Sequence, residues 1–66
     1  GTADMIPRIK EGLARLPDGY RAVLSMILFE GFDYEEVAKI LEVKESTVRS
    51  QYMRGRDKLI KIVNEL

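Results

Sequence analysis

Two stretches with helical hydrophobic spacing, separated by only a few residues, constrain this chain more than any other feature. Apolar side chains recur at Tyr34, Val37, Ala38 and Leu41, and a second series begins at Val48. Spacings of three and four residues place such side chains on one stripe of an α-helix. Two helices joined by a turn of three or four residues form a helix-turn-helix, whose second helix can enter a DNA major groove. We therefore predict a helix-turn-helix over residues 33–62 and infer that the chain binds DNA.

The second of these helices divides into an apolar and a polar face. At about 100° per residue, the apolar face collects Val48, Tyr52, Gly55, Leu59, Ile62, Val63 and Leu66. The opposite face supplies the residues predicted to bind DNA: Ser46, Arg49, Ser50, Met53 and Arg54 toward the bases, and Thr47 at the flank, within reach of phosphates. Arginine suits guanine edges, serine bonds to several bases, and methionine can contact a thymine methyl. Flanking phosphate contacts are predicted for Tyr34, Lys44, Arg56 and Lys58. The alternative is that these charges are simply solvated.

The charge distribution supports the DNA-binding interpretation although the net charge is zero. Residues 1–43 hold five basic and eight acidic residues, a net charge of −3. Residues 44–66 hold six basic and three acidic residues, a net charge of +3. The positive charge therefore coincides with the predicted recognition helix.

The rest of the chain predicts two further helices, so the fold class is all-α: one four-helix domain, residues 1–66, with a C-terminal helix-turn-helix. The first is expected over Pro7–Arg15, because proline favours the first helical position. Residues 1–4 are set aside as a vector-derived or disordered end. The second is expected from Pro17 or Asp18 to Glu30, ending at a glycine. Asp33 and Glu36 match a capping box at the start of the third, and the fourth is expected to begin within residues 44–46.

The first two helices also carry apolar stripes. The first has Ile6, Ile9, Leu13 and Leu16, and the second has Tyr20, Val23, Leu24 and Ile27. Ala22, Met26 and Phe29 lie nearly opposite the second stripe. They form either a surface that docks on a protein partner or a second buried face of a central helix.

The missing residue types exclude several classes of function. The sequence has no Cys and no His, so it offers neither a thiolate metal site nor the usual general base. We predict no catalytic residue, no bound metal and no cofactor. No apolar run approaches the length of a membrane span, and we expect a cytoplasmic protein with no membrane partner.

Several sequence blocks resemble region 4 of bacterial sigma factors, most closely the extracytoplasmic-function type. The blocks are Leu16-Pro17, Tyr20-Arg21, Glu30-Gly31-Phe32, Tyr34 to Leu41, Ser46 to Ser50 and Arg54 to Leu59. The resemblance implies recognition of the promoter −35 element, docking on the flap of the RNA polymerase β subunit during transcription initiation, and control by an anti-sigma factor. It also places base contacts at Arg49, Ser50, Met53 and Arg54.

Three positions depart from that family's usual pattern. Ile27 occupies a place where many members carry an arginine that approaches the DNA backbone. Glu42 stands where the turn often has glycine, and Lys44 stands where serine usually caps the recognition helix, so the cap is either lost or shifted to Ser46. Two alternatives stay open. One is a LuxR-type regulator domain, which shares the four-helix pattern; the other is a helical module whose basic face binds an acidic protein.

Overall fold

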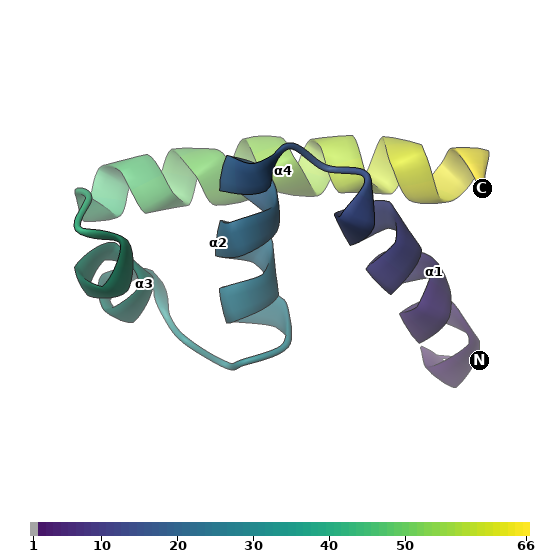
Figure 1. Cartoon of the computed structure of the whole chain (residues 1–66), viewed down its shortest axis with the longest axis horizontal. Helices are drawn as coiled ribbons and strands as arrows, with labels where there is room; N and C mark the ends of the chain where they lie inside the picture. The colour runs from purple at the N-terminus through teal and green to yellow at the C-terminus, as the bar shows by residue number, and fades with distance from the viewer. Residues whose placement is uncertain (1) are drawn as a thin grey trace.

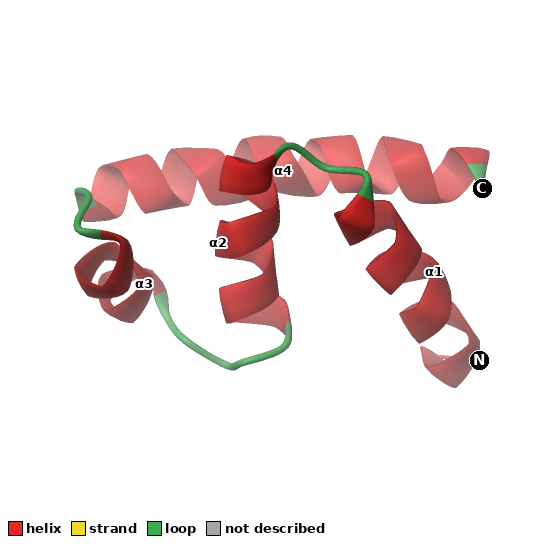
Figure 2. Cartoon of the chain, viewed as in Figure 1, coloured by secondary structure: helices red, strands yellow, loops and turns green. Residues whose placement is uncertain are grey.

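The computed structural model describes residues 2–66 and contains four helices joined by short loops (Figures 1 and 2). They are α1 (Thr2–Ala14), α2 (Asp18–Leu28), α3 (Tyr34–Leu41) and α4 (Glu45–Glu65). With 21 residues at about 1.5 Å each, α4 runs along the 33 Å long axis of the molecule. The other three helices pack along one side of α4 (Figure 1). The all-α prediction is confirmed, and none of the described helices is long and apolar enough to cross a membrane.

The predicted start of the first helix is wrong. Helix α1 begins at Thr2, so Pro7 lies inside it and residues 2–4 are helical; residue 1 lies outside the described residues. The prediction failed because proline is favoured in the first turn of a helix, whereas further inside it loses an amide hydrogen bond and its ring crowds the preceding turn. Asp4 in the first turn favours the earlier start by interacting with the helix dipole.

Helix α2 ends two residues earlier than predicted, at Leu28. The amide groups of Phe29 and Glu30 both donate to the carbonyl of Ser25, so the hydrogen-bond spacing widens from four to five residues and the α-helical pattern stops before the expected end. Gly31 then adopts a φ of 76°, which glycine tolerates without steric cost. The predicted glycine turn is therefore present, but beyond the helix end.

The capping box of α3 is confirmed. The Asp33 side chain accepts a hydrogen bond from the Glu36 amide at 2.8 Å, and the Glu36 carboxylate accepts one from the Asp33 amide at 3.1 Å. Both interactions satisfy amide groups that a helix start leaves without partners. Short-range sequence spacing thus defines where the helix-turn-helix begins.

The turn between α3 and α4 holds the strained residue of the fold. Glu42 has φ 57° and ψ 46°, the left-handed conformation that the expected glycine would favour. Helix α4 then begins at Glu45, with Lys44 as N-cap residue and no side-chain hydrogen bond to the first turn. The cap is therefore lost, and it does not shift to Ser46.

Two groups of buried side chains share α4. The first group joins α1, α2 and the second half of α4 through Leu13, Leu16, Leu24, Leu59 and Val63. The second joins α2, α3 and the first half of α4 through Val23, Val37, Ala38 and Val48. The predicted stripes are confirmed except at their outer ends. Ile6 and Leu66 are 42% and 40% exposed, because no described helix extends over them.

Candidate nucleic-acid interface

The six residues of α4 that are predicted to bind DNA lie on the side of the helix that faces away from the core. Ser46, Thr47, Arg49, Ser50, Met53 and Arg54 are all exposed, whereas Val48 in the same turns is fully buried. Val48 packs with Val37 and Ala38 of α3, which fixes the rotation of α4 about its axis. The structure therefore brings all six onto one free surface, as the periodicity predicted.

Arg49 is the most constrained member of this surface. Its guanidinium donates to the Glu45 carboxylate at 3.2 Å, one helical turn earlier. Its Cζ atom also lies 5.4 Å from the centre of the Tyr34 ring, on α3. Arg49 is thus held by contacts from two helices, while its side chain stays 60% exposed.

Arg54 has a different environment. Among residues 2–66, no ion pair or ring contact involves Arg54, and Met53 beside it is 42% exposed. A mobile arginine can reach more than one acceptor but loses more conformational freedom on binding. The two arginines of the surface therefore differ in how far they are ordered before a ligand arrives.

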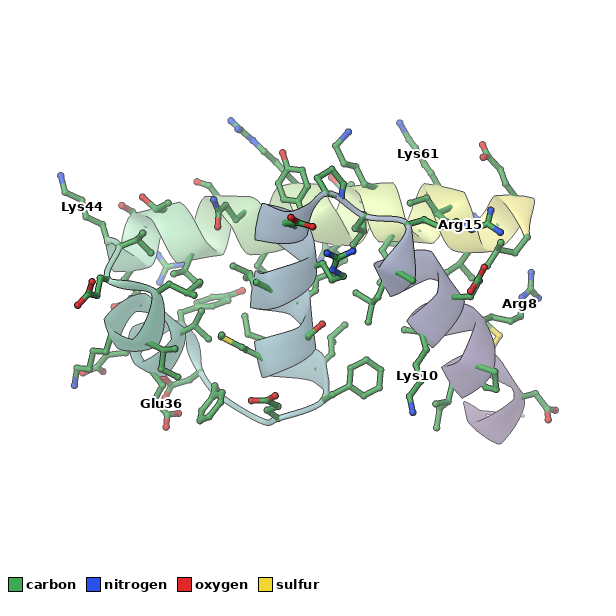
Figure 3. All side chains as sticks on the ribbon, viewed as in Figure 1. Arg8, Lys10, Arg15, Glu36, Lys44 and Lys61 are labelled. Atoms are coloured by element: carbon green, nitrogen blue, oxygen red, sulfur yellow. The ribbon has the colours of Figure 1, made fainter. Side chains whose placement is uncertain are left out.

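The residues predicted to contact phosphates are spread over a longer surface. Lys44 precedes α4 and Tyr34 begins α3, whereas Lys58 lies in the second half of α4, 6.0 Å from the Tyr20 ring. Arg56 pairs with Asp57 at 3.7 Å. Lys44 and Lys61, labelled in Figure 3, point away from α1–α3 along the outer edge of α4. The basic surface therefore extends beyond the turns of α4 that carry the residues predicted to read bases.

Comparison with known proteins agrees with this geometry. Residues 7–59 match the family model described as sigma-70, region 4. The chain belongs to the sigma-70 region 4 family. Region 4 is the sigma-factor domain that binds the promoter −35 element, so the predictions of a sigma-type helix-turn-helix and of a DNA-binding, non-enzymatic function are confirmed. The LuxR-type alternative is set aside.

Individual sigma factors support the same assignment. The chain is 31% identical over 58 residues to RNA polymerase sigma-H factor of Pseudomonas aeruginosa, covering 88% of this chain and 30% of that protein. It is 41% identical over 51 residues to ECF RNA polymerase sigma factor SigE of Mycolicibacterium smegmatis, covering 77% and 20%. It is 35% identical to RNA polymerase sigma factor SigZ of Bacillus subtilis, covering 77% and 29%. This region 4 sequence thus spans less than a third of the relatives it matches.

The predicted docking residues do not form one continuous exposed patch on this region 4 domain. Phe29 is 46% exposed, with Lys10 Nζ 5.9 Å from its ring centre. Met26 is half-buried against the core between α2, α3 and α4, and Ala22 is also half-buried. Leu28, which the sequence reasoning did not include, is 46% exposed. Of the three predicted docking residues only Phe29 is exposed, and with Leu28 it forms an exposed apolar surface at the end of α2.

Sequence reasoning also missed an apolar hollow between α1 and the end of α4. It has a volume of about 240 Å³ and is lined by Met5, Ile9, Leu59, Ile60, Val63 and Asn64. Met5 and Ile60 are 40% and 50% exposed. One sequence feature could have indicated this hollow: Ile60 is an apolar residue outside the predicted apolar face of α4. Met5 was not expected to contribute, because the first helix was predicted to begin after it.

Proposed function

We propose that this chain is the −35 recognition domain of a bacterial extracytoplasmic-function-type sigma factor, acting in transcription initiation in the cytoplasm. Family membership implies binding to DNA and RNA polymerase. The single observation that carries the proposal is the free surface of α4, where Arg49 and Arg54 lie opposite the buried Val48. A helix held in this way by α3 can present one face to a major groove.

In this proposal Arg49 and Arg54 read guanine edges, with Ser46, Ser50 and Met53 between them. Thr47 adds a further contact to DNA. Phosphate contacts come from Tyr34, Lys44, Arg56 and Lys58, which position α4 but carry no sequence information. The hydroxyl of Tyr34 and the charge of Lys44 flank the start of the recognition surface, and Lys58 extends it along α4.

The test is binding to an array of DNA duplexes that covers every eight-base-pair sequence, at low salt. We expect wild type to prefer a defined sequence. Arg49→Ala and Arg54→Ala should each weaken binding to that sequence by about 1–3 kcal/mol, roughly 5- to 150-fold, and relax selectivity at separate positions.

Arg15→Ala is the matched control, because Arg15 is an exposed arginine in an i, i+4 pair with Glu11 at 3.1 Å, comparable to the Arg49–Glu45 pair. It directly follows the last residue of α1, away from the proposed DNA surface. Equal effects of Arg15→Ala and Arg49→Ala would show a non-specific charge effect and overturn the assignment. Binding of an acidic protein without any duplex preference would support an interaction module instead.

We also propose that the end of α2 docks on the flap of the RNA polymerase β subunit, and that an anti-sigma factor can cover the same surface. The support is the 46% exposure of Phe29 and of its neighbour Leu28, since exposed aromatic and aliphatic side chains favour protein contacts. Ala22 and Met26, both half-buried, would form the edge of this surface.

Phe29→Ser tests the docking site by measuring affinity for core RNA polymerase and for a purified β-flap fragment. We expect weaker binding to both, with DNA selectivity unchanged. Ile60→Ser is the matched control, because Ile60 is 50% exposed at the hollow between α1 and α4. If Ile60→Ser weakens flap binding and Phe29→Ser does not, the hollow is the docking site and the α2 surface is not.

A further inference from the structure

Arg49 lies against Tyr34, whose ring in turn contacts Tyr52 on the other helix of the helix-turn-helix. The Tyr34 ring, on α3, lies 5.4 Å from Arg49 Cζ on one side. It also contacts the Tyr52 ring of α4, with centroids 5.7 Å apart and planes tilted by 59°. Tyr52 packs against both buried groups of the core, and Tyr34 against the one between α2, α3 and α4. The ring beneath Arg49 is therefore itself anchored.

This contact uses the part of a guanidinium that base reading does not need. A guanidinium attracts an aromatic ring through its flat face. It reads guanine through its N–H edge, by two parallel hydrogen bonds to O6 and N7. A contact of Arg49 Cζ with the Tyr34 ring at 5.4 Å restricts the side chain, and a face-on arrangement would leave nitrogen donors free at its edge. The Glu45 carboxylate binds Nη2 of the same group at 3.2 Å and limits its rotation further.

We propose that Tyr34 is a positioning residue for base selectivity: its ring holds Arg49 in a reading conformation before DNA arrives. This role rests on the proposed function and adds to the phosphate contact predicted for the Tyr34 hydroxyl. The two roles depend on different parts of the side chain, because the ring acts on Arg49 and the hydroxyl acts on phosphate. They therefore predict different effects on selectivity and on overall affinity.

The experiment compares Tyr34→Phe with Tyr34→Leu on two duplexes: the sequence preferred by wild type and the same sequence with the guanine assigned to Arg49 changed to adenine. The ratio of the two affinities measures selectivity. Tyr34→Phe should keep the wild-type ratio even if affinity for both duplexes falls. Tyr34→Leu should reduce the ratio about two- to fivefold, the range expected from an exposed cation–π contact.

Two controls separate positioning from general damage to the fold. In an Arg49→Ala background, Tyr34→Leu should change the ratio no further, since no guanidinium is left to hold. Lys10→Gln removes the cation of a comparable contact, in which Lys10 Nζ lies 5.9 Å from the centre of the Phe29 ring, and should leave the ratio unchanged. Circular dichroism melts check that each variant is folded under the binding conditions.

A second measurement needs no DNA. In the free protein, nuclear magnetic resonance should show the Arg49 side-chain δ protons shifted upfield by the Tyr34 ring. The shift should persist in Tyr34→Phe and disappear in Tyr34→Leu. Absence of the shift in wild type, or an unchanged duplex ratio in folded Tyr34→Leu, would overturn the inference. Absence of any duplex preference in wild type would instead overturn the proposed function, and with it the use of this contact in reading.

Discussion

Replacing Gly55 by alanine tests how closely α2 and α4 must approach. Two energies oppose each other in this variant. Alanine is favoured over glycine inside a helix by about 1 kcal/mol. Against this, a Cβ atom at residue 55 would lie 2.6 Å from Cδ1 of Leu24 and 3.1 Å from Cβ of Tyr20. Leu24 is fully buried, and the Tyr20 Cβ is fixed to the backbone, so neither neighbour can simply rotate away.

Overpacking of this kind typically costs about 1–3 kcal/mol. We expect the steric term to prevail, so that Gly55→Ala lowers the free energy of unfolding by up to about 2 kcal/mol, the overpacking cost less the gain in helix propensity. For a domain of this size, 1 kcal/mol corresponds to roughly 4–8 °C in Tm. Thermal and urea melts followed by circular dichroism give both quantities.

Gly19→Ala is the matched control, because Gly19 is also helical but its nearest neighbour to an added Cβ is Gln51 Nε2 at 3.9 Å. With no clash, this variant should gain up to about 1 kcal/mol, mainly by restricting the unfolded chain. If Gly55→Ala raised Tm as much as Gly19→Ala does, the tight crossing of α2 and α4 would be refuted. A loss in both variants would instead indicate that helix propensity has been misjudged here.

Three further predictions concern the turn and the free domain. Glu42→Gly should raise stability by up to about 1 kcal/mol, because it relieves a left-handed residue, whereas Glu42→Ala should not; equal melts for both would contradict this. Lys44→Ser should raise the free energy of unfolding by about 0.5–2 kcal/mol, because it restores an N-cap; chemical denaturation measures this. The same variant should bind all duplexes more weakly in fluorescence anisotropy, and stronger DNA binding would exclude Lys44 as a phosphate contact. The domain alone should bind most duplexes with a Kd of roughly 10⁻⁴–10⁻⁶ M at physiological salt; nanomolar affinity in the same titration would show that it needs no second attachment.

The features that sequence predicted well depend on nearby residues. The capping box needs only Asp33 and Glu36, and the two faces of α4 follow from helical geometry. The left-handed turn at Glu42 followed from a resemblance to sequences with glycine there, and the structure confirms it. In each case the decisive interaction lies within a few residues along the chain.

The features that could not be predicted from the sequence depend on how the helices are placed against one another. Ile6 continues the apolar stripe of α1, yet the N-terminal end of α1 points away from α4 (Figure 1), and the side chain is exposed. The contact of Tyr34 with Arg49 joins residues on two helices, so spacing within one helix could not reveal it. The Glu45–Arg49 pair is different: its i, i+4 spacing was a usable signal.

The two halves of α4 pack against different buried groups, and this arrangement allows the domain to have two separate binding surfaces. The first half of α4 packs on α3 through Val48 and carries the proposed DNA surface, while the second half packs on α1 through Leu59 and Val63. Arg8 of α1 also donates to the carbonyl of Val63 at 3.0 Å and so holds the far end of α4. A partner bound near α1 or the end of α2 therefore need not obstruct the reading turns. With a net charge of zero, such a domain gains little from long-range attraction to DNA, and attachment to polymerase would supply the missing affinity by raising its effective concentration at the promoter.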